Sequence, residues 1–479
     1  MTSDFVQTLL ANTWSILLVV LFFGGSIFVH ELGHFLAARW RGAKVERFSI
    51  GFGPAIVSWR GRDGVEYRLA WFPLGGYVLL PQLADLGTIE GRSELDAQQL
   101  PPVSYPTKMI VFAAGALFNV LFAFGLASII WVIGQPESNE TASRSIGYVY
   151  RTVELPGGAT VASPASEAGL RVGDVIQAID GHAVAKWIDI YALIGLGTGV
   201  NSDGGRQAVF TILRDGQVLE ITVHPRLVGE EKERRVGIAP GYELTVLQVL
   251  PGSIAARAGF HPDDILLSLD GQRVLSPLTC QDVLEASAKR SVAARVNRGG
   301  RELVLTIPAR PSAKSGASIG LGLATGYTLI HPTPFAQISE QVTLSFRTLW
   351  SLVNPHSDIG ISKLTGPVGI VRIFHSAAEA GLRPVLMFTI LLNMSLAIFN
   401  LLPIPVLDGG QMMFATIGRL RGRALPVNFV MAANSIFIVL LLSMVIYVSI
   451  FDVRRLNRDR AEAATPAAAP ATPPVPAKP

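Results

Sequence analysis

The sequence predicts a polytopic α-helical membrane protein with four transmembrane helices, two inserted mostly-β domains and a membrane-associated β-hairpin. Three observations predict this architecture. Four long stretches of the 479-residue chain carry no charged residue, a segment in the middle of the chain is repeated, and an alternating hairpin pattern follows the first apolar stretch. Hydrophobic residues make up 49% of the chain and charged residues 16%. Soluble proteins average about 25% charged residues, so this composition excludes a disordered or fibrous protein.

Each charge-free stretch is long enough to cross a bilayer. The stretches cover residues 5–29, 109–136, 384–407 and 424–451, and a span needs about 20 mostly apolar residues. No Lys or Arg precedes the first stretch, so we interpret it as a retained helix rather than a signal peptide. We assign residues 1–38, 109–136, 384–410 and 424–451 to the four helical segments.

Basic residues predict the orientation of the spans. Nine Lys and Arg residues lie in the loop 39–108 and three lie in 419–423. In a four-span protein both loops face the same side, which the positive-inside rule makes cytoplasmic. Four arginines between 454 and 460 favour the opposite orientation but are outnumbered. We therefore expect the termini and residues 137–383 outside the cytoplasm.

Residues 55–72 have the pattern of a β-hairpin. An apolar run at 56–59 precedes the turn-like sequence 61–64, and then Val65, Tyr67, Leu69 and Trp71 alternate with other residues. This alternation predicts two paired strands, and the aromatic residues suit a membrane interface.

The segment between the second and third spans is a duplication. Residues 168–176 (AGLRVGDVI) return as 258–266 (AGFHPDDIL), and 179–181 (IDG) return as 269–271 (LDG). Such spaced self-similarity predicts two copies of one mostly-β module, which we place at 137–240 and 241–312.

The remaining segments connect or end these parts. In the linker 313–383, apolar residues at helical spacing predict an amphipathic helix over 335–353. The tail 461–479 is almost entirely Ala and Pro, so we expect it to be disordered.

The sequence His30-Glu31-Leu32-Gly33-His34 is an H-E-x-x-H motif at the end of the first apolar stretch. Positions i and i+4 share one helix face, so the two imidazoles can bind one Zn²⁺ while Glu31 serves as a general base toward water. Coincidence is the alternative. Ionisable groups in a membrane helix are functional-site candidates by default, which favours the metal site.

A catalytic zinc site needs a third protein ligand. The third apolar stretch runs into residues 400–410 (NLLPIPVLDGG), and the predicted topology brings Asp408 to the membrane face of His34. A turn residue is the alternative, because Asp-Gly is a common turn pair. We favour the ligand. Pro403 and Pro405 break the helix and free backbone groups, which is tolerated in a membrane only where protein or a water-filled cavity covers them.

Together these features resemble the site-2 protease family of intramembrane zinc metalloproteases, and specifically its members with two tandem PDZ domains. The resemblance rests on residues 30–34, 48–54, 73–78, 366–370 and 400–409, and on the repeated AGLxxGD pattern of the modules. Gln411 stands where this family often has His, and Leu79 stands where it usually has Lys. Neither position is a metal ligand or the base.

The resemblance implies an activity. It implies an enzyme of the bacterial inner membrane that cleaves transmembrane segments of single-span proteins, such as an anti-sigma factor after a first external cut. Its metal ligands are His30, His34 and Asp408, its cofactor is Zn²⁺ and its base is Glu31.

The resemblance and the hairpin pattern together give candidate substrate contacts. We expect Asn400 to bind substrate backbone, with a helix–helix contact as the alternative. We place Pro403, Pro405, Tyr67 and Leu69 at the substrate site. A substrate helix must unwind before hydrolysis, and the edge of the hairpin is suited to hold it by strand addition. A plain hairpin packed on the bundle is equally compatible with the pattern.

The PDZ-like modules leave two roles open: they bind peptide C-termini, or they only exclude untrimmed substrates by size. The formal charge of +4 is small and scattered, so we expect no nucleic acid partner. Two rival functions are a non-catalytic PDZ membrane adaptor and a metal transporter. The adaptor does not explain an intact set of ligands and base. The transporter does not explain Glu31, and the sequence lacks paired half-helix repeats.

Overall fold

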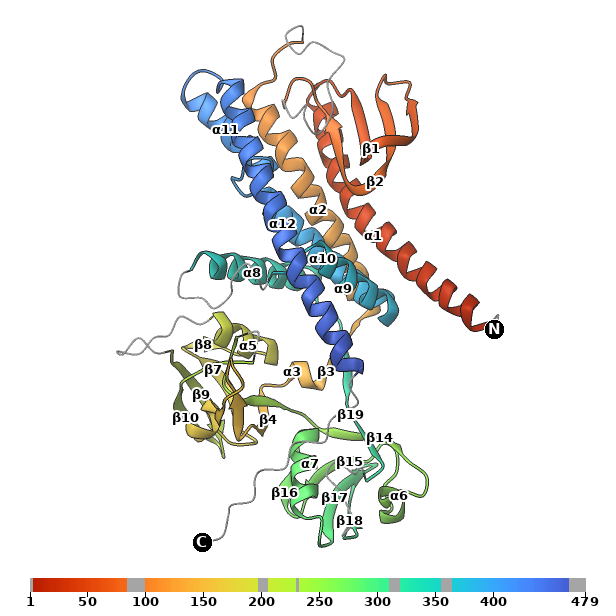
Figure 1. Ribbon diagram of the computed structural model, residues 1–479, viewed down its shortest axis with the longest axis vertical. Helices are drawn as coiled ribbons and strands as arrows, with labels where there is room; N and C mark the ends of the chain where they lie inside the picture. Colours follow the sequence, from red (N-terminus) through yellow and green to blue (C-terminus); the bar gives the residue numbers. More distant parts are fainter. Residues whose placement is uncertain are drawn as a thin grey trace. The chain divides into compact units, whose positions relative to one another are not determined.

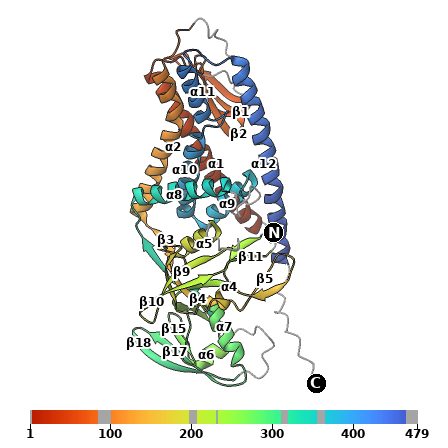
Figure 2. The same ribbon diagram turned by 90° about the vertical axis from the view of Figure 1, so that its left-hand side faces the viewer.

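The structure is a computed structural model, shown in Figures 1 and 2, and it describes residues 3–83, 100–196, 206–229, 232–309, 319–354 and 364–464. The chain forms two compact units. We call the first the membrane unit, comprising Met1–Gln135, His331–Leu349 and Ile361–Arg458, and the second the inserted unit, whose main part is Pro136–Ile330. Most of the Ala/Pro tail predicted at 461–479 lies outside the described residues.

Four helices of the membrane unit are long and apolar enough to cross a bilayer, as predicted. They are α1 (Ser3–Trp40), α2 (Tyr105–Ile133), α10 (Leu382–Asn400) and α12 (Val427–Ala464). Their candidate spans are Val20–Trp40, Tyr105–Ile133, Leu382–Asn400 and Val427–Asn457.

The ends of two spans can be compared with the expected ones. The first span continues to Trp40, close to the expected limit at residue 38, and the H-E-x-x-H motif lies on this helix as predicted. The third span ends at Asn400 because Pro403 and Pro405 cannot continue it, and a separate helix α11 (Asp408–Leu420) follows.

Small residues let α1 and α2 pack closely. A Cβ atom added to Gly33 of α1 would lie 2.5 Å from the carbonyl oxygen of Ala114 in α2. Glycine at a helix contact permits such an approach of two backbones in a membrane. Ser104 caps the start of α2, since its hydroxyl accepts a hydrogen bond from the Thr107 N–H.

The predicted hairpin is present with longer strands, β1 (Arg47–Arg60) and β2 (Glu66–Leu79), beside α1 in Figure 1. Both strands bend, so residues 47–50 pair with 76–79 on one side and with 66–69 on the other. Residues 66–69 also pair with 57–60. The resulting sheet has four rows, with 57–60 and 76–79 as its outer rows. Phe35 of α1 and Phe48 and Val78 of the sheet share one core.

Two further helices connect the inserted unit to the third span. Helix α8 (Pro334–Val353) covers the residues for which we expected an amphipathic helix. Helix α9 (Pro367–Ala380) was not anticipated, and it buries Phe374 and Ala378 against Leu18 of α1 and Val385 of α10.

The inserted unit contains two modules of the same topology, which confirms the duplication. The first has the sheet order β10-β9-β7-β4-β13 and the second β18-β17-β15-β14-β19. The first uses β4 (Ser145–Val149), β7 (Val175–Ile179), β9 (Ala208–Arg214), β10 (Gln217–Val223) and β13 (Ile238–Gly241) with α5 (Trp187–Leu196). The second uses β14 (Leu244–Val249), β15 (Ile265–Leu269), β17 (Val292–Arg298), β18 (Arg301–Ile307) and β19 (Leu321–Thr325) with α7 (Pro277–Ala286). Strand β19 extends the second module beyond the expected limit at residue 312.

Shorter elements complete the inserted unit. They are β3 (Gln135–Ser138), α3 (Asn139–Ala142), β5 (Thr152–Glu154), β6 (Thr160–Ala162), α4 (Pro164–Glu167), β8 (His182–Ala183), β11 (Arg226–Val228), β12 (Glu233–Arg235), α6 (Ile254–Ala258), β16 (Gln272–Arg273) and β20 (Tyr327–Ile330). Strand β20 pairs with β3, so the chain enters and leaves the unit through paired strands.

Each module is tied together by the same buried ion pair. Asp174 accepts two hydrogen bonds of 2.7 Å from Arg214, and Asp264 accepts bonds of 2.7 and 2.8 Å from Arg298. The two aspartates occupy matching positions of the repeat. Bidentate pairs of this kind are the stronger class of hydrogen-bonded ion pair.

The two modules also contact each other. The hydroxyl of Thr279 in α7 donates to the Gly147 carbonyl at 2.6 Å, and the Tyr148 hydroxyl donates to Asp282 at 2.9 Å. Helix α7 of the second module is thus bound to strand β4 of the first.

Candidate metal centre

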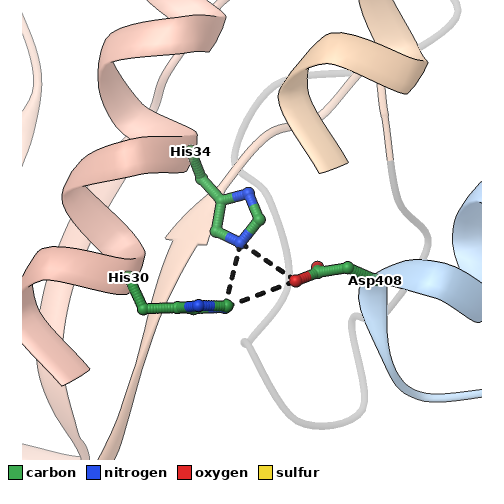
Figure 3. Close-up of side chains that lie close together, drawn as sticks. All are labelled: His30, His34 and Asp408. Carbon is green, nitrogen blue, oxygen red and sulfur yellow. Dashed lines mark hydrogen bonds and ion pairs between the residues drawn. The ribbon is translucent and has the colours of Figure 1, made fainter. Parts of the chain in front are cut away.

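Three side chains from two helices converge on one point, as Figure 3 shows. His30 and His34 come from α1 and Asp408 comes from α11. The Nε2 atoms of the two histidines are 3.2 Å apart. The Asp408 Oδ2 atom lies 3.3 Å from His30 Nε2 and 3.4 Å from His34 Nε2.

These distances fit a zinc ion. Tetrahedral coordination with bonds of about 2.0–2.1 Å places neighbouring ligand atoms about 3.3–3.4 Å apart. Oδ2 of Asp408 is buried and accepts no hydrogen bond. Two imidazole nitrogens and a carboxylate oxygen at this spacing form a donor set for one cation, with a fourth position left for water. The sequence prediction of the three ligands therefore agrees with the geometry.

The backbone of α2 fixes the tautomer of His34. Its Nδ1 lies 2.8 Å from the Val111 carbonyl oxygen, which can only accept, so Nδ1 carries the proton and Nε2 is left as the ligand atom. Gly115 of α2 makes this approach possible. A Cβ atom at that position would collide with Nε2 of His34 and would lie 2.7 Å from Cε1 of His30.

Asn119 of α2 plays the same part for His30. Its side chain is fully buried, and its amide nitrogen is placed 3.3 Å from His30 Nδ1 while its amide oxygen has no partner. If Nε2 binds the metal, Nδ1 carries a proton and needs an acceptor. The oxygen and nitrogen of an amide are assigned from such networks, so the amide oxygen belongs next to Nδ1. Nothing in the local sequence around Asn119 identified this role.

A strained turn positions Asp408 at the site. Val406 has φ of 84°, an outlier for a β-branched residue, and its N–H donates to Asn434 Oδ1 of α12 at 3.2 Å. Gly409 and Gly410 pack on the carbonyl groups of the turn, where an added Cβ would overlap the backbone oxygens of Leu402 and Ile404. These contacts explain the two glycines after Asp408.

Although burial alone would raise it, the two neighbouring imidazoles hold the pKa of the Asp408 carboxyl well below its usual range. The carboxyl group is therefore ionised at neutral pH, the form that a metal ligand requires.

The remaining predicted site residues fall into two groups. Glu31 and Asn400 line the same cavity as the three ligands, and Asn400 Nδ2 is 3.5 Å from His30 Nε2. Pro403 and Pro405 shape the turn before Asp408 and are not among the residues that line this cavity.

Tyr67 and Leu69 lie in the middle of the β1–β2 sheet, where both sides of the strand are paired. The Tyr67 ring stacks on Trp59 and its hydroxyl donates to Asp63 at 2.9 Å. The sheet residues that do line the cavity are Gly76, Tyr77 and Val78, at an outer row. Residues 73–78 contributed to the family resemblance in the sequence but were assigned no role at the site.

Comparison with known proteins gives the same result as the geometry. Peptidase family M50 matches residues 18–444. The chain belongs to peptidase family M50. It is 28% identical to the Regulator of sigma-E protease RseP of Escherichia coli, covering 92% of this chain and 99% of that protein. It is 29% identical to a Putative zinc metalloprotease of Xylella fastidiosa, covering 90% and 96% of the two chains. A Putative zinc metalloprotease of Treponema pallidum is also 29% identical, with 84% of this chain covered.

Membership of family M50 and the triad of His30, His34 and Asp408 make this chain a membrane zinc metalloprotease. The site-2 protease resemblance of the sequence is thereby confirmed.

Proposed function

We propose that this M50 protease cleaves transmembrane segments of single-span membrane proteins, and that its substrate is an anti-sigma factor already cut outside the membrane. The observation that carries the proposal is the shared cavity. Three metal ligands, Glu31 and an outer row of a β-sheet line one cavity in the membrane unit. Relatives of nearly the same length are named regulators of sigma-E, which supports the anti-sigma factor as the substrate class.

The outer row of the sheet supports binding of an unwound segment. Within the described residues, 76–79 pair on one side only, with 47–50. Gly76, Tyr77 and Val78 line the metal cavity. A substrate strand added there satisfies the backbone groups that unwinding exposes, so the row binds the chain in extended form beside the ligands. The free row thus replaces the Tyr67 and Leu69 region as the proposed point of strand addition.

Small residues keep this row accessible. A Cβ atom on Gly76 would lie 2.8 Å from Cγ of Glu31, and one on Gly75 would overlap the Phe52 ring. Glycine at position 76 lets the strand approach the Glu31 side chain, and glycine at position 75 leaves room for the Phe52 ring.

The residues of the site have complementary tasks. When bound, zinc lowers the pKa of its water and polarises the scissile carbonyl. Glu31 accepts the proton of the attacking water and passes it to the leaving amine nitrogen. Asn400 ends α10 and lines the cavity, which supports a role for its amide in hydrogen-bonding the substrate backbone. The turn that contains Pro403 and Pro405 holds Asp408 and Asn400 in their places.

The first module supports a PDZ-like role in peptide binding. A cavity of about 270 Å³ lies between α5 and β13, lined by Trp187, Ile190, Tyr191 and Ile194 from the helix and by Val236, Gly237 and Ile238 at the strand. In the described residues β13 is the last strand of its sheet. An extended peptide or C-terminus can add to this strand and place one apolar side chain in the cavity. We propose that this module receives the end left by the first cut.

The basic loops support the proposed orientation. Residues 39–108 and 419–423 carry the excess of Lys and Arg, which supports a metal site near the cytoplasmic face and modules outside.

The test uses purified full-length protein in detergent and two forms of one single-span substrate, with and without its external domain. Wild type is compared with Glu31→Gln, and bound zinc and cleavage are measured in the same samples. We expect equal zinc in both proteins, and cleavage only by wild type and preferentially of the trimmed form. Zinc without cleavage by wild type over several trimmed substrates would support an adaptor instead. Equal cleavage of both forms would show that the protease does not require a substrate that has first been trimmed outside the membrane.

A further inference from the structure

A second cavity of the membrane unit has the character of a lipid site. Its volume is about 480 Å³, and it lies where the beginning of α2, the end of α11 and the beginning of α12 meet. Figure 1 shows these helix ends together at one end of the helical bundle. The cavity is distinct from the metal cavity, although Phe112 and Gln411 line both.

The rim of this cavity is basic. Lys108, Arg419 and Arg423 line it, and no acidic side chain is among its described lining residues. The Arg419 guanidinium lies 4.8 Å from the centre of the Tyr105 ring, which holds the side chain at the rim. Three cations without a lining carboxylate attract an anionic group.

The floor of the cavity is apolar. Leu83, Val103, Phe112 and Phe414 form its inner wall, and Val427 and Met431 of α12 form its outer wall. Val427 and Met431 are 52% and 45% exposed, and the neighbouring Phe429 is 55% exposed. The apolar wall therefore continues onto the outer surface of a membrane span. A soluble phosphate compound would gain nothing from such a wall, whereas an acyl chain would be buried by it.

The cavity lies at the level along the spanning helices where lipid headgroups are expected. Tyr105 and Val427 are the first residues of two candidate spans. The ends of spans lie at the level of the headgroups, and basic pockets between spanning helices bind anionic headgroups. We propose that this cavity binds one anionic phospholipid, with its phosphate against Lys108, Arg419 and Arg423 and an acyl chain along α12.

Such a lipid would act on the metal centre through α11. This helix has Asp408 at its first turn and Arg419 at its last. The Tyr105 hydroxyl is 3.1 Å from the Thr416 hydroxyl, so α11 is already fastened to the beginning of α2. A phosphate bridging Lys108 of α2 and Arg419 of α11 strengthens that fastening and holds Asp408 in place. The bound lipid is therefore expected to slow loss of the metal. This consequence rests on the metal site, but lipid binding itself does not.

The experiment titrates purified full-length protein in neutral detergent with a phosphatidylglycerol labelled in one acyl chain. Labelled phosphatidylcholine and inorganic phosphate serve as comparison probes. The test variant is Arg419→Gln/Arg423→Gln. The matched control is Arg60→Gln/Arg62→Gln, which removes the same charge from the tip of the β1–β2 hairpin. Helix content by circular dichroism accompanies every titration.

We expect saturable binding of phosphatidylglycerol, weak binding of phosphatidylcholine and no displacement by millimolar phosphate. The test variant should bind about 20- to 30-fold more weakly, and the control within about threefold of wild type. If the double variant does not fold, Lys108→Gln replaces it, with an expected loss of about fivefold.

Equal binding of the two lipids, or an equal loss in the control, would overturn the proposal. Displacement by phosphate would assign the site to a soluble anion instead. Zinc release into a chelator is followed in the same samples, with and without phosphatidylglycerol. Saturable lipid binding with an unchanged release rate would overturn only the link to α11.

Discussion

Replacing Asn119 by Leu tests whether a residue that contacts no substrate orients a metal ligand. The buried amide of Asn119 faces His30 Nδ1 at 3.3 Å, and the amide has no second partner in the described structure that could hold it there. Leucine has a similar size and cannot accept a hydrogen bond from the Nδ1–H group. Without that acceptor, the imidazole loses the contact that keeps its Nε2 atom directed at the metal.

The size of the effect follows from the contact. Loss of a hydrogen bond to a metal-binding histidine typically lowers metal affinity by about 10- to 100-fold, or about 1.4–2.8 kcal/mol. The apparent zinc Kd is measured by competition with a chelator of known affinity. Asn119→Asp keeps an acceptor and should hold zinc within about threefold of wild type.

Asn393→Leu is the matched control for loss of a buried amide. Asn393 is fully buried in α10, and its amide donates to Ser26 Oγ of α1 and to the Thr389 carbonyl, both at 2.8 Å. Removing it should lower stability by about 0.6–1.7 kcal/mol, as for polar contacts between membrane helices, and leave the zinc Kd within about twofold. A wild-type zinc Kd in Asn119→Leu, or equal losses in both variants, would refute the reasoning.

Three other predictions follow from the same structure. Gly115→Ala should weaken zinc binding at least tenfold, because the added Cβ overlaps the ligand rings, whereas Gly125→Ala on the same helix meets nothing within 4 Å and should bind zinc normally in the chelator assay. Asp264→Asn should lower the free energy of unfolding at pH 7 by about 2 kcal/mol, which is measured as a lower melting temperature. The substitution leaves Arg298 beside a neutral group, and the loss is moderate because Arg298 is partly exposed to solvent. Burial raises the pKa of Asp264, but the hydrogen bonds and charge of Arg298 together with the His261 N–H lower it further, so the native pKa lies below the unfolded value of about 3.9. The stabilisation is therefore present above about pH 4 and is lost as pH falls through the lowered native pKa, so the difference in stability between the two proteins should shrink steadily below about pH 4. Thr279→Val should leave each module folded but increase protease cleavage between the modules, because α7 loses its bond to the Gly147 carbonyl.

Local patterns in the sequence determined much of this protein. The charge-free stretches defined four spans because a bilayer requires about 20 apolar residues in each. The spacing of His30 and His34 placed both on one helix face without knowledge of any other element. The repeat at 168–176 and 258–266 defined two modules, since each copy carries its own strands and turns. The order of the spans also predicted that Asp408 lies at the membrane face of the two histidines, and the structure has its carboxylate beside them.

Tertiary structure decided which residues complete the site. Asn119 and Gly115 lie in an apolar helix whose sequence does not reveal which neighbour it faces, and their partners are on α1. The outer row at 76–79 follows from how two bent strands pair, and the alternation of side chains does not reveal which row remains unpaired. The basic cavity is formed by α2 together with α11 and α12, and α2 lies about 300 residues before the other two helices in the chain. Periodicity determines the face that a helix or strand presents, but the identity of its partner depends on packing between distant segments, and the sequence does not show this directly.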